Sequence, residues 1–182
     1  MAFNFTQLSI PEVVLIEPTR HHDARGFFSE TFRASAFDSH VGATFVQDNF
    51  VRSGPQVVRG LHYQLSPRPQ GKLIQVLRGH ILDIAVDLRR SSATFGQWVG
   101  QEISDTNGEI LWIPPGFGHG YAVLSDGADV MYKVTEEYDA TLDRGIRWND
   151  PDLAVTWPSS DAVLSEKDRA LPLLSETADL FA

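Results

Sequence analysis

Short apolar segments separated by turn-forming residues recur along nearly the whole chain. Runs rich in Val, Ile, Leu and aromatic residues alternate with Pro, Gly, Asn and Asp, which favour turns. This pattern predicts strands at residues 13–16, 25–32, 45–51, 59–64, 72–77, 81–88, 95–100, 110–113, 121–124, 130–134 and 155–157. Helices are expected only at 34–40 and within 165–174. Because no helical stretches alternate with the strands, as a βαβ fold requires, the pattern predicts an all-β sandwich, jelly roll or small barrel with short peripheral helices.

Polar residues gather between apolar ones in the stretch from Arg59 to Lys72. Its middle, residues 66–71, is Ser-Pro-Arg-Pro-Gln-Gly, a composition typical of a turn. We therefore expect a β-hairpin in which His62 and Lys72 lie opposite each other, since paired positions are ~5 Å apart at Cβ. Alternation places Lys72 on the same inward face as Ile74 and Val76. Because an inward lysine is costly unless an anionic group meets it, this stretch is a candidate site.

Length and composition narrow the class of protein. With 182 residues, one domain spanning 1–182 is expected, in which segment 159–182 folds back onto the barrel. The net charge of −9 argues against a nucleic-acid binder, because phosphate affinity comes from clustered Lys and Arg. The absence of cysteine excludes disulfides, zinc–thiolate sites and thiol nucleophiles. No leader peptide and no apolar run near ~18 residues is visible, so we expect a cytoplasmic protein without membrane association.

His62 is the first candidate for chemistry. A single histidine on an apolar strand is usually a buried structural residue, but Arg59, Gln64 and Lys72 accompany it here. Polar residues that converge on one cavity favour a site, and a neutral imidazole is a natural general base near neutral pH. Lys72 either stabilises negative charge on an oxygen or extends its ammonium to solvent from the end of its strand.

Three consecutive polar residues, Gln47, Asp48 and Asn49, stand inside an expected strand. Adjacent residues point to opposite faces, so at least one should face the core and find a partner there. We expect that partner to be a ligand. In another apolar strand, Asp83 is expected either to partner Lys72 or to face solvent.

Two tyrosines also have a plain and a functional interpretation. Tyr132 fits a core tyrosine, yet its phenol could donate a proton once an enolate forms. Tyr138 fits a surface residue, yet an aromatic ring there could stack on a base.

The turn that ends at His119 resembles the second motif of cupins, Pro-Gly-x-x-His. In metal-binding cupins that histidine joins a His-x-His pair and a Glu from the first motif. Here the first motif would be residues 60–64, with Gln64 in place of the second histidine and no carboxylate close behind. One or two imidazoles make a poor metal site, so we expect a cupin-like barrel without metal.

Six motifs in order resemble one family, the dTDP-4-dehydrorhamnose 3,5-epimerases. They are DARGFFSE (23–30), VQDN (46–49), RGLHYQ (59–64), QGK (70–72), WIPPGFGHG (112–120) and RGIRWNDP (144–151). Each motif alone is weak, but six in order are specific, and the resemblance runs from about Ile10 to Arg169.

The resemblance implies a jelly roll that acts without metal or other cofactor, usually as a homodimer. It implies epimerisation at C3 and C5 of dTDP-4-dehydro-6-deoxy-D-glucose through enolates, which gives dTDP-4-dehydro-L-rhamnose for dTDP-L-rhamnose synthesis. By position, His62 resembles the base, Asp168 its carboxylate partner, Tyr132 the acid on the opposite face of the sugar, and Lys72 the cation on the C4 carbonyl oxygen. The implied substrate-binding residues, some of them acting across the dimer, are Arg25, Glu30, Gln47, Asp48, Asn49, Arg59, Lys72, His119, Tyr138, Asp143 and Arg169.

Two positions depart from the family pattern, and other functions remain open. Residues 142–143 are Leu-Asp where the family often has His-Glu, and Arg169 stands where lysine is frequent. The enzymatic alternative is a relative that inverts only C3 or only C5. A non-catalytic nucleotide-sugar binder is a second alternative, although binding alone needs no matched acid and base. A metal-dependent cupin oxygenase is disfavoured by the missing His-x-His and Glu.

Overall fold

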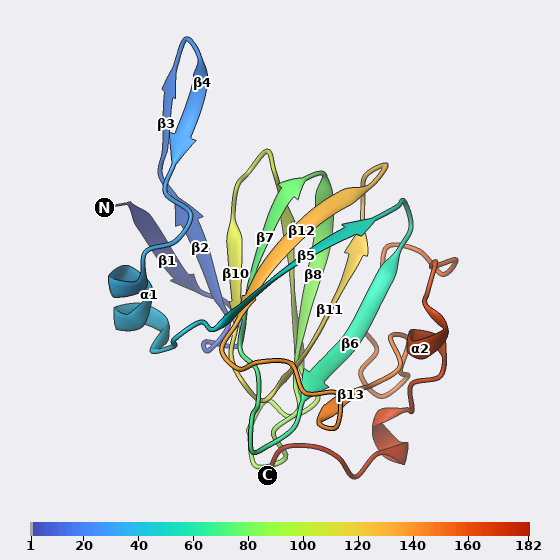
Figure 1. Cartoon of the computed structure of the whole chain (residues 1–182). Helices are drawn as coiled ribbons and strands as arrows, with labels where there is room; N and C mark the ends of the chain where they lie inside the picture. The colour runs from blue at the N-terminus through green and yellow to red at the C-terminus, as the bar shows by residue number, and fades with distance from the viewer. Residues whose placement is uncertain (1) are drawn as a thin grey trace.

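Two large antiparallel sheets pack face to face in the computed structural model, which describes residues 2–182 (Figure 1). The first sheet contains, in spatial order, β1 (Phe3–Gln7), β2 (Val14–Pro18), β10 (Ile110–Ile113), β7 (Lys72–Arg78), β12 (Ala128–Val134) and β5 (Gln47–Ser53). The second contains β13 (Asp143–Gly145), β6 (Val58–Gln64), β11 (Phe117–Val123), β8 (His80–Asp87) and β9 (Trp98–Ser104). This confirms the predicted all-β class and the cupin-type jelly roll.

The period-two alternation of the strands builds the core between the sheets. Ile74 and Val76 of β7 belong to one buried cluster with Ile81 and Ala85 of β8 and with Val130 of β12. Intervening positions such as Leu77 point outward. One face of each sheet is therefore apolar along most of its length, and it gives way to polar side chains only at one end of the sandwich.

The predicted hairpin between residues 59–64 and 72–77 is wrong. β6 pairs with β11 and β13 in the second sheet, whereas β7 pairs with β10 and β12 in the first. The turn residues 65–71 do reverse the chain, but they carry it across the sandwich to the facing sheet. The predicted inward direction of Lys72 is correct, because its side chain is buried on the same face as Ile74 and Val76.

Several shorter elements differ from the expectation. α1 (Ala34–Val41) forms as predicted and buries Phe37, and it ends where Gly42 adopts a left-handed φ of 62°. Part of 165–174 is helical, as α2 (Glu166–Arg169) and the 3-10 turn Leu174–Glu176. The strand expected at 155–157 is wrong, since these described residues form a loop in which Trp157 Nε1 donates to Trp148 O. The strand expected at 95–100 begins only at Trp98, after a turn.

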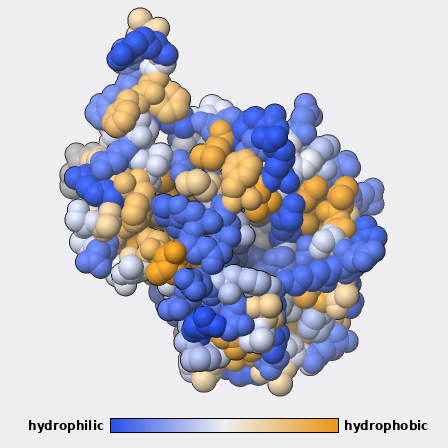
Figure 2. Space-filling view, in the orientation of Figure 1, coloured by the Kyte–Doolittle hydropathy of each residue, from blue (hydrophilic) through white to orange (hydrophobic). Residues whose placement is uncertain are grey.

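A narrow hairpin projects from the body of the sandwich. Its strands are β3 (Arg20–Asp23), which the sequence did not predict, and β4 (Gly26–Ser29), part of the strand expected at 25–32. Figure 1 shows this hairpin reaching beyond both sheets, and Figure 2 shows apolar residues exposed along it. Among the described residues the longest helix is α1, and none of the helices is long and apolar enough to cross a bilayer.

Two glycines let β6 and β11 approach unusually closely. A Cβ on Gly60, whose φ is +113°, would lie 2.6 Å from both Gly120 Cα and His119 O. A Cβ on Gly120 would lie 2.6 Å from Arg59 O. The pairing shifts register at this point and makes His119 the direct neighbour of His62. The close approach therefore sets the two histidines side by side on the second sheet.

The terminal segment, residues 159–182, runs along the outside of the second sheet (Figure 1). Val163 forms a parallel bridge with Val57, and Phe181 forms another with Arg89. Between these points, α2 contacts β6 and buries Asp168. This course brings a carboxylate from near the end of the chain to the strand that carries His62.

Candidate active site

A cavity of about 360 Å³ opens where polar side chains replace the apolar core. Side chains from both sheets and from α2 line it. The lining includes these residues predicted for the site: Gln47, Asn49, Arg59, His62, Lys72, His119, Tyr132, Tyr138 and Asp143. Most of the candidates that the sequence spreads over nearly a hundred positions therefore meet in one place.

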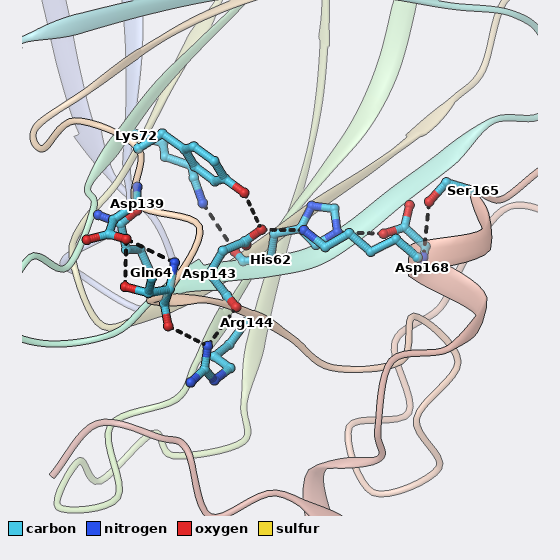
Figure 3. Close-up of polar contacts among 11 residues, drawn as sticks. His62, Gln64, Lys72, Asp139, Asp143, Arg144, Ser165 and Asp168 are labelled. Atoms are coloured by element: carbon cyan, nitrogen blue, oxygen red, sulfur yellow. Dashed lines mark hydrogen bonds and ion pairs between the residues drawn. The ribbon is translucent and has the colours of Figure 1, made fainter.

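His62 is held by Asp168. The distance from His62 Nε2 to Asp168 Oδ1 is 2.5 Å, and the Asp168 side chain is almost fully buried (Figure 3). Asp168 is itself fixed, because its N–H donates to Ser165 Oγ at 3.0 Å at the start of α2. A neutral imidazole that donates from Nε2 keeps a lone pair on Nδ1, so the pair is arranged to take up a proton there. Burial is the largest single influence and raises the pKa of Asp168, but the hydrogen bond and charge of His62, with smaller contributions from Ser165 and Lys167, together outweigh it, so the net pKa is lowered.

Lys72 enters the cavity from the opposite sheet. Its Nζ donates to the backbone oxygen of His62 at 3.1 Å, so it spans the gap between β7 and β6. Burial lowers the pKa of Lys72 to about 8, while the carboxylates of Asp143 and Asp83 oppose this shift. A lysine with one backbone partner in a buried site keeps donors available for a ligand oxygen.

Tyr132 faces His62 from the other sheet. It lies on β12, where its neighbours across the strands are Asn49 and Ile74. Burial raises the pKa of its phenol, and the nearby Arg59 guanidinium opposes the rise. The phenol therefore retains its proton at neutral pH. A flat ligand held between the sheets would have an imidazole on one face and a phenol on the other.

A second histidine–carboxylate pair lies beside the first. Asp83 is fully buried and its Oδ1 accepts from His119 Nε2 at 2.6 Å. The expectation that Asp83 faces solvent is therefore wrong, and its direct partner is His119 rather than Lys72. Asp83 still acts on Lys72 through charge. Its Oδ2 is a buried atom without a hydrogen-bond partner among the described residues.

The three polar residues at the start of β5 point alternately to the two faces of the first sheet. Gln47 and Asn49 line the cavity and are joined by a 2.9 Å hydrogen bond. Asp48 points to the other face, where it pairs with Lys133. At the rim, Gln47 Oε1 accepts from the backbone N–H of Tyr138 at 2.9 Å. The expectation that at least one residue of this stretch faces inward is confirmed for two of the three.

An acidic and aromatic group forms the rim of the cavity. The Tyr138 hydroxyl donates to Asp143 Oδ2 at 3.0 Å, and Lys167 Nζ forms an ion pair with the same oxygen. Lys167 was not among the predicted site residues. It precedes Asp168 on α2, and the only signal for it was the Ser165 cap that fixes the start of that turn.

Four of the predicted substrate-binding residues do not reach this cavity within one chain. Arg25 lies on the projecting hairpin in an ion pair with Asp23, and Glu30 pairs with Arg33. Asp48 faces away, as described above. Arg169 is exposed and is not among the residues that line the cavity.

The described side chains do not form a metal-ligand set. Gln64, where a cupin would have its second histidine, donates to Arg68 O and accepts from the N–H of Asp139 (Figure 3). His62 and His119 each direct Nε2 to a carboxylate. No group of three His, Cys, Asp or Glu within residues 2–182 is placed to hold an ion. The residues of the two cupin motifs therefore do not fit a metal.

Comparisons with known proteins point to one enzyme family. The family model for dTDP-4-dehydrorhamnose 3,5-epimerase matches residues 7–176. The Pseudomonas aeruginosa dTDP-4-dehydrorhamnose 3,5-epimerase is 50% identical over 167 residues, which cover 90% of this chain and 92% of that protein. A Streptomyces niveus dTDP-4-dehydrorhamnose 3-epimerase is 34% identical over 174 residues, 94% of this chain and 84% of that protein.

A solved structure matches closely along nearly the whole chain. It is the Legionella pneumophila dTDP-6-deoxy-D-glucose-3,5-epimerase in complex with dTDP-4-keto-L-rhamnose. The TM-score is 0.92 at 47% identity, with 96% of this chain and 94% of that chain covered. The two proteins therefore share both the β-sandwich fold and nearly half of their aligned residues.

Proposed function

The chain belongs to the dTDP-4-dehydrorhamnose 3,5-epimerase family, and we propose that its cavity inverts C3 and C5 with His62 as the base and Tyr132 as the acid. The enzyme converts dTDP-4-dehydro-6-deoxy-D-glucose to dTDP-4-dehydro-L-rhamnose in dTDP-L-rhamnose biosynthesis. The observation that supports these residue roles is that the imidazole and the phenol line one cavity from facing sheets, with the Lys72 ammonium in the same cavity beside His62.

The proposed reaction begins with proton removal next to the ketone. His62 Nδ1 takes the proton from C3 or C5, and the C–H electron pair forms the C=C bond of an enolate. The negative charge moves to the C4 oxygen, where the Lys72 ammonium stabilises it. Tyr132 then donates its phenolic proton to the opposite face of the same carbon, which inverts that centre. Proton exchange with solvent returns both side chains to their starting states, so the atoms balance without a redox partner.

Asp168 supports the base in this scheme. Its carboxylate fixes the tautomer of His62 and stabilises the imidazolium that forms after proton removal. One keto group acidifies both neighbouring carbons, so one site can process C3 and C5 in turn. Arg59, His119, Gln47 and Asn49 remain to bind the sugar and the diphosphate, and Tyr138 at the rim is exposed enough to stack on thymine.

Incubation of the enzyme with dTDP-4-dehydro-6-deoxy-D-glucose in deuterated water tests the proposal. We expect deuterium at both C3 and C5, because every inversion replaces the original hydrogen with one from solvent. The label is located by NMR of the product. Label at one carbon only would show a mono-epimerase, the alternative represented by the Streptomyces niveus relative. No label at either carbon would favour a non-catalytic binder.

We extend the proposal to a homodimer in which the projecting hairpin serves the partner's cavity. Arg25 lies on this hairpin, away from the cavity of its own chain. The hairpin exposes Phe27 and Phe28, at 55% and 70% of their surface, and the edge strand β5 exposes Phe50 at 58%. Aromatic residues this exposed are typical of a contact surface.

Subunit mixing distinguishes a hairpin that acts on the partner from one that acts on its own chain. Arg25→Ala and His62→Ala homodimers should each have low activity. If Arg25 serves the partner, a co-expressed mixture should recover about a quarter of wild-type activity, since half the dimers are mixed and each has one intact site. A monomeric mass by light scattering, or a mixture no more active than its parents, would contradict this arrangement.

A further inference from the structure

The motif at residues 144–151 lines no part of the cavity, yet it contacts the strand that carries His62 and the chain that directly follows the helix of Asp168. We call it the bracing segment. It begins on β13, at the edge of the second sheet, and continues beneath the terminal segment that carries α2 (Figure 1). Its contacts with β6 on one side and with the chain after α2 on the other indicate a structural role for a motif that does not line the cavity.

On one side, the bracing segment is fastened to β6. Gly145 is the strand partner of His62 itself. The next residue, Ile146, exchanges two backbone hydrogen bonds with Leu61, at 3.0 and 2.9 Å. Both apolar side chains are fully buried in one cluster. The backbone on either side of the His62 side chain is therefore held by the bracing segment.

On the other side, the bracing segment holds the chain that follows α2. The N–H of Arg147 donates to Pro172 O at 2.8 Å, and its Nε donates to Leu171 O at 3.2 Å. Asp150 Oδ2 accepts from the N–H of Leu174 at 2.7 Å. These bonds lie three to six residues after Asp168, in the chain that directly follows α2.

Asp150 is a buried anchor and not a surface charge. Only 1% of it is exposed, and its Oδ1 accepts from the N–H groups of Asp152 and Leu153, both at 2.9 Å. With the bond from Leu174, one carboxylate receives three backbone N–H groups, which are strong, charge-assisted bonds. It connects the bracing segment rigidly to the terminal segment.

α2 needs such support because it is only four residues long. A single helical turn has almost no stability of its own, so its position depends on the chain at its two ends. Val163 holds the preceding end through its bridge to Val57. The following end is held by the bracing segment. Gly145 lets the bracing segment fit closely between β6 and the terminal segment, since a Cβ there would lie 2.6 Å from Leu61 O and 2.7 Å from a Leu171 methyl.

We propose that Asp150 and Arg147 are positioning residues of the epimerase, which hold Asp168 at hydrogen-bonding distance from His62 by bracing α2 against β6. The inference rests on the proposed roles of His62 and Asp168. One eight-residue segment fixes both members of the pair to a common frame. Displacement of the terminal segment would separate the pair while leaving His62, Lys72 and Tyr132 in place on their strands.

The variant Asp150→Asn tests the proposal with little change of volume. The amide has one acceptor oxygen instead of two and sets an NH2 group against backbone N–H donors, so the Leu174 or the Asp152–Leu153 contacts must break. We expect kcat to fall about tenfold or more with KM changed less than about threefold, a loss typical of groups that orient a functional residue. In 15N-histidine-labelled protein, the low-field proton resonance of His62 Nε2–H should move upfield or broaden.

Asp87→Asn is the matched control. Asp87 is also fully buried and anchors a turn by accepting from the N–H of Arg89 and from Ser92 and Thr94, but it contacts neither β6 nor the terminal helix. It should lower Tm comparably while leaving kcat and the His62 resonance unchanged. If Asp150→Asn does not fold, Arg147→Met, which removes only the bond to Leu171 O, should lower kcat about threefold and shift the same resonance.

The double variant separates this inference from the function on which it rests. In an Asp168→Asn background, Asp150→Asn should cause little further loss of kcat, because the pair it positions is already broken. Multiplicative losses, or wild-type kcat and an unshifted resonance in the folded single variants, would overturn the positioning role. Wild-type kcat in Asp168→Asn itself would instead refute the proposed role of the pair.

Discussion

His62→Ala is expected to abolish deuterium exchange at both C3 and C5, and with it net epimerisation. The imidazole is the base on its face of the cavity, and Asp168 holds its Nε2 so that Nδ1 can accept the proton. A positioned general base contributes about 10²–10⁴-fold, so a loss of about 10³-fold or more at each carbon is expected. NMR of the sugar during incubation in deuterated water measures each carbon separately.

Tyr132→Phe is the contrasting variant. It removes the acid on the opposite face but leaves the base and Lys72 in place, so exchange should survive better than inversion. Equal loss of both would contradict a separate role for Tyr132 as the acid. In His62→Ala, exchange at one carbon at the wild-type rate would contradict the single base. His119 would then be the second base, because its Nε2 bonds to Asp83 as that of His62 bonds to Asp168.

Most of the strands could be predicted from the sequence, but their partners could not. Alternation along β7 correctly placed Lys72 beside Ile74 and Val76, because side-chain direction in a strand is set locally. The turn at 65–71 indicated that the chain reverses, and the nearest explanation was a hairpin. Whether the returning strand joins the same sheet or the facing one depends on packing against distant strands. For β7 those strands are β10 and β12, which lie far along the chain.

The same limit applies to the site. Alternation indicated, without any tertiary knowledge, that at least one of Gln47, Asp48 and Asn49 faces inward, and the structure shows that Gln47 and Asn49 do. It could not reveal that Asp83 meets His119, since that pair depends on which strands of the second sheet are neighbours. Asp168 lies in a stretch, 165–174, for which the pattern predicted only a short helix, and only the family resemblance connected it to His62. The structure explains that contact, because the terminal segment runs along the second sheet and brings Asp168 to His62.

Lys72→Met is expected to lower activity about 10²–10³-fold and to raise the stability of the fold. The ammonium is the group placed to stabilise the enolate oxygen, and loss of one such donor typically has this effect on kcat. Burial lowers the pKa of Lys72 from its usual 10.5 to about 8, so keeping it charged at neutral pH costs roughly 3 kcal/mol. Methionine has a similar length and no charge to bury.

The pH dependence of the wild type should separate these two effects. Above about pH 8 the folded protein loses the Lys72 proton, so kcat/KM should fall on the alkaline side with a midpoint near 8. Between about 8 and 10.5 the unfolded chain binds more protons at this residue than the folded one, so Lys72 makes the free energy of unfolding rise with pH. Denaturant titrations across this pH window should show that rise in the wild type and not in Lys72→Met.

Two results would contradict a desolvated cation in the cavity. One is a Lys72→Met variant that is less stable than the wild type at pH 7, and the other is a wild-type activity that stays flat to pH 10. The electrostatic role of Lys72 would then have to be assigned to another group.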